Sequence, residues 1–167
     1  MIIGLSVGAF TTLHVIISLI GLASGVIAVA AMLQDKRPGP WTAIFLASTV
    51  LTSVTGFLFH STKIGPPHIL GVLSLIVLAL ALVALYAMHL KGVWRPVYVI
   101  SAVLALYFNA FVGVVQAFVK IEVLKALAPT GSEPPFLVAQ LVVLVLFVLL
   151  AFLATKRFHP VMLAQPA

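Results

Sequence analysis

Residues 134–155 read PPFLVAQLVVLVLFVLLAFLAT and carry no charged side chain. An α-helix needs about 20 apolar residues to cross the hydrocarbon core of a bilayer, so this stretch is long enough to span one. Other uncharged runs of at least that length occupy residues 1–34, 38–62, 64–90 and 96–119. These runs, separated by charged residues, predict a protein that crosses the membrane several times.

The composition of the chain independently indicates a membrane protein. Hydrophobic residues make up 63% of the sequence, charged residues make up 7%, and the mean hydropathy is +1.31. A soluble domain of this composition would have an insoluble surface. We therefore expect the lipid bilayer to be the main partner of the chain.

Charge and cysteine content exclude several function classes. The net charge of +6 does not indicate nucleic acid as a partner, because the basic residues lie scattered at the ends of the apolar runs. They form no basic patch with interleaved aromatic residues. The absence of cysteine excludes disulfides, thiol catalysis and metal sites built from cysteine.

Charges and helix breakers divide the chain into helices. Turn sequences such as Asp35–Pro40, Gly65–Pro67 and Ala128–Pro135 separate the apolar runs. We expect helices at about residues 11–32, 41–60, 67–88, 97–124 and 136–155. The predicted fold is an all-α integral membrane bundle of five transmembrane helices, antiparallel between neighbours because the connections are short. Residues 1–158 would form one transmembrane domain and residues 159–167 a short tail.

The distribution of Lys and Arg between the two ends of the helices predicts the orientation. One side holds six of these residues: Lys36, Arg37, Lys91, Arg95, Lys156 and Arg157. The other side holds three: Lys63, Lys120 and Lys125. Because short cytoplasmic loops carry the excess of positive charge, we expect the N-terminus outside and the C-terminal tail in the cytoplasm. In a bacterium, this membrane would be the inner membrane.

Polar and small residues recur at helical spacing within the apolar runs. In the first helix they are His14, Ser18, Gly21 and Gly25. In the second they are Thr49, Thr52, Ser53, Gly56 and His60, and in the fourth Asn109, Gly113, Gln116 and Lys120. Polar side chains are costly in hydrocarbon and usually face the interior of a bundle. We therefore expect a polar pocket near the outer leaflet, formed by His14, His60, His68, Gln116, Lys120 and Gln140.

One interpretation of these faces is helix packing. Gly21 and Gly25 form a GxxxG pattern, which lets helices approach closely. The chain would then be a non-enzymatic accessory subunit that contacts other membrane subunits, or a second copy of itself, through the Gly21/Gly25 face. Alternatively, it would be a small-ligand-binding protein that uses the polar pocket. No catalytic residue is assigned in either case.

A second interpretation makes histidines the ligands of a metal or haem. Neutral imidazole binds copper, zinc and haem iron. His14, His60 and His68 would hold a b-type haem or copper in electron transfer or metal handling. By contrast, His89 and His159 lie beside basic residues at the inner boundary, where an interfacial position is expected.

A third interpretation is a pocket for a quinone or a lipid. His14, Asn109 and Gln116 would offer hydrogen bonds inside an apolar cleft, beside aromatic residues such as Phe108. Across these interpretations, the candidates for cofactor binding are His14, His60, His68, Asn109 and Gln116.

Three segments of the chain carry a family resemblance. They are GPPHILG at Gly65–Gly71, YFN at Tyr107–Asn109 and SEPPF at Ser132–Phe136. In these segments the chain resembles small, uncharacterised polytopic membrane proteins of bacteria. The resemblance implies a bacterial inner-membrane protein with four or five helices, and it implies no activity, cofactor or functional residue.

Overall fold

The computed structural model describes residues 1–59 and 65–160, and most of this part of the chain is helical. The long helices are α1 (Val7–Leu33), α3 (Pro66–Leu82), α4 (Trp94–Lys120) and α6 (Pro134–Arg157). The shorter elements are α2 (Pro40–Gly56), α5 (Glu122–Leu127) and the π-helical turn η1 (Val83–Ala87), which continues α3. The predicted all-α class is confirmed.

Proline or serine marks the starts of α1, α2, α3 and α6. Pro40, Pro66 and Pro134 each lie in the first turn of a helix, where the missing N–H has no intrahelical partner to lose. Ser6 caps α1 by accepting a hydrogen bond from the Ala9 N–H at 3.2 Å. The helix starts therefore follow from residue types that the sequence already displays.

Four helices are long and apolar enough to cross a membrane: α1, α3 with η1 (Pro66–Ala87), α4 and α6. By length and composition, the chain is therefore a multi-pass membrane protein. The remaining long element, α2, has 17 residues. At 1.5 Å per residue it is about 25 Å long, at the short end of the range for a span.

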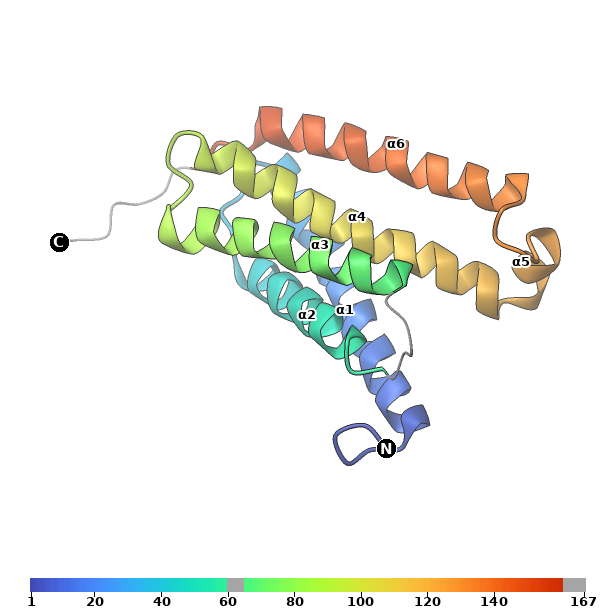
Figure 1. The fold of residues 1–167 in the computed structure, drawn as a ribbon. Helices are drawn as coiled ribbons and strands as arrows, with labels where there is room; N and C mark the ends of the chain where they lie inside the picture. Colours follow the sequence, from blue (N-terminus) through green and yellow to red (C-terminus); the bar gives the residue numbers. More distant parts are fainter. Residues whose placement is uncertain (60–64, 161–167) are drawn as a thin grey trace.

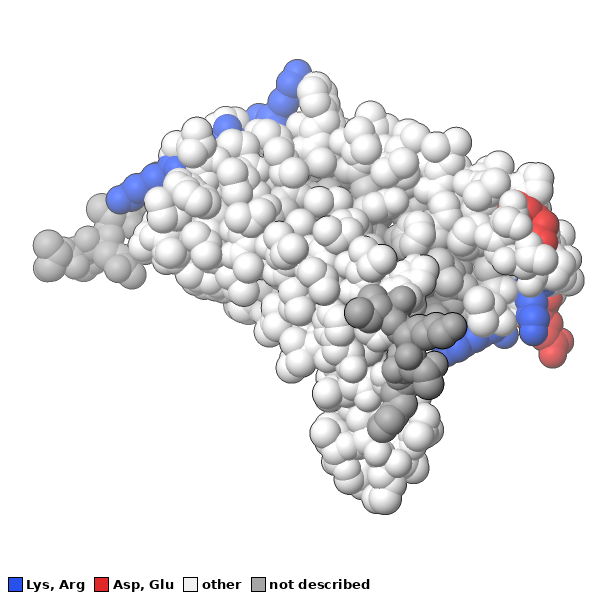
Figure 2. Space-filling view, in the orientation of Figure 1, with Lys and Arg blue, Asp and Glu red and all other residues white. Residues whose placement is uncertain are grey.

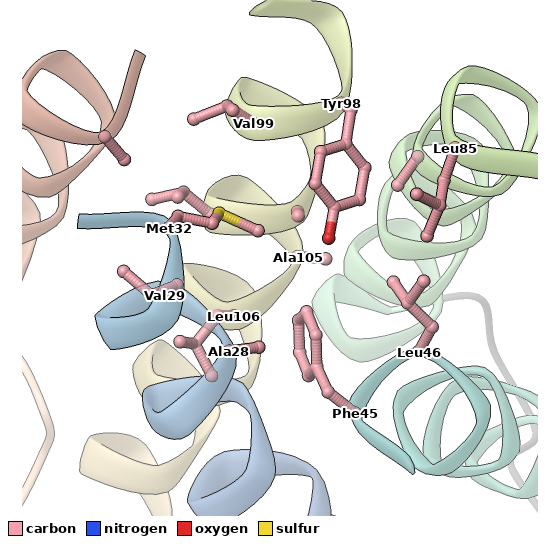
Figure 3. Packing of buried hydrophobic residues seen from close by; sticks show 14 of the residues in the cluster. Ala28, Val29, Met32, Phe45, Leu46, Leu85, Tyr98, Val99, Ala105 and Leu106 are labelled. Atoms are coloured by element: carbon pink, nitrogen blue, oxygen red, sulfur yellow. The ribbon is translucent and has the colours of Figure 1, made fainter. Parts of the chain in front are cut away.

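The central helix of the bundle is α4, which contacts α1, α2, α3 and α6. Figure 1 shows α3, α4 and α6 running side by side, while α1 passes behind α2 at a steeper angle. The core contains Phe45 of α2, Leu78 of α3, and Tyr98 and Leu106 of α4, each at most 1% exposed. Figure 3 shows the ring of Tyr98 directed toward Phe45. Several core positions are alanine, which allows close van der Waals packing between helices.

Two glycines set the closest approach of α1 to its neighbours. A Cβ atom added to Gly25 would lie 2.5 Å from Leu106 Cδ1 and 2.8 Å from Phe45 Cδ2. At Gly21, an added Cβ would lie 3.0 Å from Asn109 Nδ2. The Gly21/Gly25 face is therefore filled by α2 and α4 of the same chain. This corrects the expectation that the face contacts another subunit or a second copy.

Hydrogen bonds join three parts of the chain at one end of the bundle. Arg95 donates to the carbonyl oxygens of Thr155 at 2.9 Å and Phe158 at 2.6 Å. The His159 N–H donates to Asp35 Oδ1 at 2.6 Å. These bonds bring together the α1–α2 connection, the start of α4 and the end of α6. The prediction of orientation from the Lys and Arg count placed these three segments on the same side of the membrane. Figure 2 shows Lys and Arg at opposite ends of the visible face, with an uncharged surface between them.

The helix predicted over residues 97–124 ends earlier than expected. Its last residue is Lys120, because Ile121 is extended, with φ −92° and ψ 115°. The short helix α5 follows at once. Neither glycine nor proline stands at this break. The end of this helix at Lys120 could therefore not be predicted from a helix breaker in the sequence.

The helix predicted over residues 41–60 also ends early, at Gly56. The following residues turn, and the ring of Phe59 packs against that of Phe10 with 5.1 Å between centroids. The predicted final residue, His60, lies outside the described residues. With η1 counted as the end of α3, the other predicted helix ends lie within four residues of the observed ones.

Candidate ligand-binding cavity

A cavity of about 750 Å³ lies among α1, α2, α3 and α4. Four of the candidate residues line it: His14, His68, Asn109 and Gln116. Lys120, the last residue of α4, lines it as well. The remaining candidate, His60, lies outside the described residues. The volume falls within the roughly 300–1,000 Å³ of small-molecule sites.

The cavity results from the way α1 crosses its neighbours. Its lining residues on α1 run from Thr11 to Leu22, and the close crossing lies at Gly21 and Gly25. Toward its N-terminus, α1 diverges from α3 and α4 (Figure 1). The lining stretch of α1 is about 16 Å long at 1.5 Å per residue, so the cavity is elongated along the helix.

The two ends of the cavity differ in chemistry. One end, called here the histidine end, contains His14, His68, Gln116 and Lys120. The other, called the crossing end, contains Ser18, Thr49, Ser74 and Asn109. Apolar side chains line the walls, among them Leu19, Leu22, Leu70, Phe108 and Val112. Apolar walls with a few placed polar groups are typical of ligand-binding sites.

The hydrogen bonds around His14 indicate which of its ring nitrogens carries the proton. Its Nδ1 lies 2.8 Å from Thr55 Oγ1. The Thr55 hydroxyl donates to the Leu51 carbonyl at 2.7 Å, which leaves its oxygen to accept from His14 Nδ1–H. In the neutral ring, Nε2 then has a lone pair and no proton. Because Nε2 has no partner among the described residues, it is available to accept a hydrogen bond from a ligand.

The ring of His68 is held in the opposite tautomer. The Gly65 N–H donates to His68 Nδ1 at 3.2 Å, and this bond caps the start of α3. Since Nδ1 accepts, the proton of the neutral ring is on Nε2, which can donate. The cavity is therefore lined by one imidazole that accepts a hydrogen bond and one that donates.

The polar groups at the crossing end mostly bond to the protein itself. Asn109, 9% exposed, donates from Nδ2 to the Ser18 carbonyl at 3.4 Å. The Ser53 hydroxyl donates to Ser74 Oγ at 3.0 Å. Thr52 Oγ1 is buried and has no hydrogen-bond partner in the part of the chain that the structure describes. Apart from Thr52 Oγ1, the polar groups available to a ligand therefore lie mainly at the histidine end.

The charge of the cavity comes from Lys120. Among the described residues that line the cavity, Lys120 is the one charged side chain, and none is Asp or Glu. Its side chain is exposed at the end of α4. Positive charge with no carboxylate in the cavity lining gives the histidine end a positive potential.

The residues that hold the two histidines were not predicted. Phe59 packs edge-on against His14 with 5.2 Å between ring centroids, and Phe57 lies 6.1 Å from His68. Thr55 supplies the hydrogen-bond acceptor for His14. The only sequence signal for these contacts is the aromatic cluster at the end of the second apolar run.

The structure corrects the place predicted for Gln140, which does not line the cavity. Its Nε2 donates to the Phe111 carbonyl at 3.2 Å and so joins α6 to α4. The reason is that α6 packs on α4 and α1, away from the cavity walls formed by α2 and α3. The two histidines expected at the interface, His89 and His159, are exposed.

The described residues do not support a metal centre. Within residues 1–59 and 65–160, no three side chains of His, Cys, Asp or Glu gather as a metal site. An axial haem ligand must present an unprotonated ring nitrogen. His14 meets this requirement at Nε2, whereas His68, in the tautomer inferred from the bond that its Nδ1 accepts, does not. The haem or copper hypothesis therefore gains no support from the two histidines described.

The fold and the cavity together define a class: a multi-pass helical membrane protein with a ligand-sized cavity among four of its helices. Comparisons of the chain with protein-family models, with curated proteins and with solved structures found no match. The function must therefore be inferred from the cavity itself.

Proposed function

We propose that this chain is a non-enzymatic membrane protein that binds a small apolar molecule with a polar head. The observation that carries the proposal is the convergence of His14, His68, Asn109 and Gln116, from three helices, on one cavity of about 750 Å³. Quinones and lipids have this chemistry, because each combines a hydrogen-bonding head with an apolar body.

The roles of the residues follow from their hydrogen bonds. His14 Nε2 would accept from a hydroxyl of the ligand, and His68 Nε2–H would donate to one of its oxygens. The amide of Gln116 can do either. The apolar body would lie along Leu19 and Val112, toward the crossing end. Asn109, already bonded to the Ser18 carbonyl, would close that end.

The proposed topology has five spans, with α2 as the shortest. The N-terminus would be outside and the C-terminal tail in the cytoplasm. The excess of six basic residues over three supports this orientation. It would put the histidine end of the cavity in the outer leaflet, and in a bacterium the membrane would be the inner one.

A variant that fills the cavity tests the binding function. Gly113 lines the cavity, and a Cβ added there would lie 3.8 Å from Leu22 Cδ1, which is ordinary contact. The backbone at Gly113 therefore accepts a side chain, and Gly113→Phe should place an aromatic ring in the cavity. A matched control is Val145→Phe, which adds a similar bulk to an α6 position that is 50% exposed.

The measurement is mass spectrometry of organic extracts from protein purified in mild detergent. We expect one amphiphile to be enriched with the wild-type protein and with Val145→Phe, and to be lost with Gly113→Phe. Equal recovery from all three proteins, or no enrichment with the wild type, would contradict the binding function.

Reporter fusions test the topology separately. A reporter at the C-terminus should be active on the cytoplasmic side, and one at the N-terminus should be active outside. The reverse result would place the histidine end in the cytoplasmic leaflet.

A further inference from the structure

We infer that the cavity binds a single-chain amphiphile with an anionic head, which enters sideways from the bilayer. This inference rests on the proposed binding function and adds the charge of the ligand, its shape and its route of entry. The shared chemistry of the head is an oxygen anion. A fatty carboxylate and the phosphate of a lysophospholipid are its two sources.

The first argument is the location of all three acidic residues of the chain. Asp35 lies at the opposite end of the bundle, where it accepts from the His159 N–H. Glu133 is bonded within its own loop, to the N–H and hydroxyl of Thr130. Glu122 is exposed at the start of α5 and does not line the cavity. No carboxylate of the chain therefore neutralises Lys120 inside the cavity.

The second argument is the set of hydrogen-bond donors at the histidine end. Lys120 offers an ammonium group, His68 offers Nε2–H, and Gln116 offers its amide N–H. A carboxylate or phosphate oxygen is purely an acceptor, and hydrogen bonds between a charged donor and an anion are about twice as strong as neutral ones. Three donors, one of them the charged ammonium of Lys120, face the single acceptor His14 Nε2, and this balance favours an anionic head over a neutral one.

The shape of the cavity argues for one chain. The α1 residues that line it span about 16 Å, and the lining stops beside the glycine crossing, where α1 packs closely on α4. Leu22 and Phe108 line this inner part. An extended acyl chain with its head at Lys120 would run along the α1 wall toward the crossing end.

The route of entry follows from the exposure of apolar wall residues. Val15 and Leu19 on α1 are 37% and 58% exposed, and Val112 on α4 is 38% exposed. All three also line the cavity. In a bilayer, apolar side chains at this depth face acyl chains. The cavity is therefore open to the hydrocarbon layer, and an amphiphile can enter it without passing through water.

The test compares probes that share one chain and differ in the head. The full-length protein is placed in phosphatidylcholine nanodiscs, and binding of tritiated palmitate is measured by scintillation proximity with empty discs subtracted. Hexadecanol and 1-palmitoyl lysophosphatidate serve as competitors. If the inference is right, palmitate or lysophosphatidate binds at least about fivefold more tightly than hexadecanol, as expected for about 1 kcal/mol from a partly exposed charge pair. Whichever of palmitate and lysophosphatidate binds more tightly identifies the source of the anion.

Two lysine variants give the decisive comparison. Lys120→Met removes the charge at the cavity and should weaken binding of the anionic probe about fivefold, with no change for hexadecanol. Lys125→Met removes a charge of the same sign from α5, which does not line the cavity, and should change neither. Equal effects of both variants, or equal binding of all three probes, would overturn the anionic head.

The Gly113→Phe variant separates this inference from the proposed function. If it abolishes binding of every probe but head charge has no effect, the cavity binds ligand and only the anionic assignment fails. If it leaves palmitate and hexadecanol binding unchanged, the binding function fails together with the inference.

Discussion

Replacement of two glycines by alanine should have opposite effects on stability, although both lie within long helices. Gly25 lies on α1 at the crossing, and Gly113 lies on α4 beside the cavity. A Cβ at Gly25 would come within 2.5 Å of Leu106 Cδ1 and 2.9 Å of Phe45 Cε2. At Gly113, the nearest atom, Leu22 Cδ1, would be 3.8 Å away. Only the first substitution forces neighbouring atoms to move.

The magnitudes follow from two opposing effects. Alanine in place of glycine favours a helix by about 1 kcal/mol at either position. Overpacking a tight core costs about 1–3 kcal/mol. Phe45 is 0% exposed and Leu106 is 1% exposed, so neither can swing outward, and we expect the upper part of that range at Gly25. Gly25→Ala should therefore lower the free energy of unfolding by about 1–2 kcal/mol, whereas Gly113→Ala should raise it by up to about 1 kcal/mol.

The assay is equilibrium unfolding by dodecyl sulfate in mixed micelles, followed through the fluorescence of Trp41 and Trp94. The two variants should differ by about 2–3 kcal/mol in their free energies of unfolding. Wild-type stability of Gly25→Ala, or equal destabilisation of both variants, would refute the close crossing of α1 with α2 and α4.

Three further substitutions test other contacts. Gly71→Ala would put a Cβ 2.9 Å from Phe57 Cζ, but that ring is 37% exposed and free to swing, so a loss below about 1 kcal/mol is expected in the same unfolding assay. Arg95→Gln removes charged hydrogen bonds to two carbonyls at the end of α6 and should cost about 1–3 kcal/mol; an unchanged midpoint would show that these bonds contribute nothing. Partial desolvation alone would raise the pKa of the Glu133 carboxyl, but hydrogen bonds from Thr130 and its neighbours outweigh it and hold that pKa below its ordinary value of 4.5. Above that value these bonds therefore protect the loop, and the protection is lost as the pH falls through the lowered pKa. The protection factor of the Thr130 amide, taken relative to its intrinsic exchange rate at each pH, should fall in acid, and Glu133→Gln should remove this pH dependence.

Helical periodicity predicted many of the residues that share the cavity. The spacing on α4 predicted a common face for Asn109, Gly113, Gln116 and Lys120, and all four line the cavity. On α1 the same logic grouped His14 with Ser18, and these two also line it. The reason is that polar and small residues in an apolar helix have few acceptable directions, so their spacing encodes the buried face.

Periodicity could not predict how the faces pair or what fixes each side chain. Gln140 was predicted to share the pocket with Gln116, yet it bonds to the Phe111 carbonyl because α6 packs on α4 and α1, away from the cavity walls formed by α2 and α3. The tautomers of His14 and His68 depend on Thr55 and on the Gly65 N–H, contacts that exist only after the helices are arranged. The helix break at Ile121 has no glycine or proline from which it could have been predicted.

The close crossing and the cavity both result from one face of α1, which carries His14, Ser18, Gly21 and Gly25. At Gly21 and Gly25 the absence of a side chain draws α1 against Asn109 and Leu106 of α4. One turn toward the N-terminus, larger residues occupy the same face of α1. There α1 diverges from α3 and α4 around the cavity that His14 lines. Because the close contact is the pivot of this divergence, a bulky residue at Gly21 would separate α1 from α4 along the whole crossing end. The cavity should then lose its closed inner end, so ligand binding and stability are linked through the same glycines.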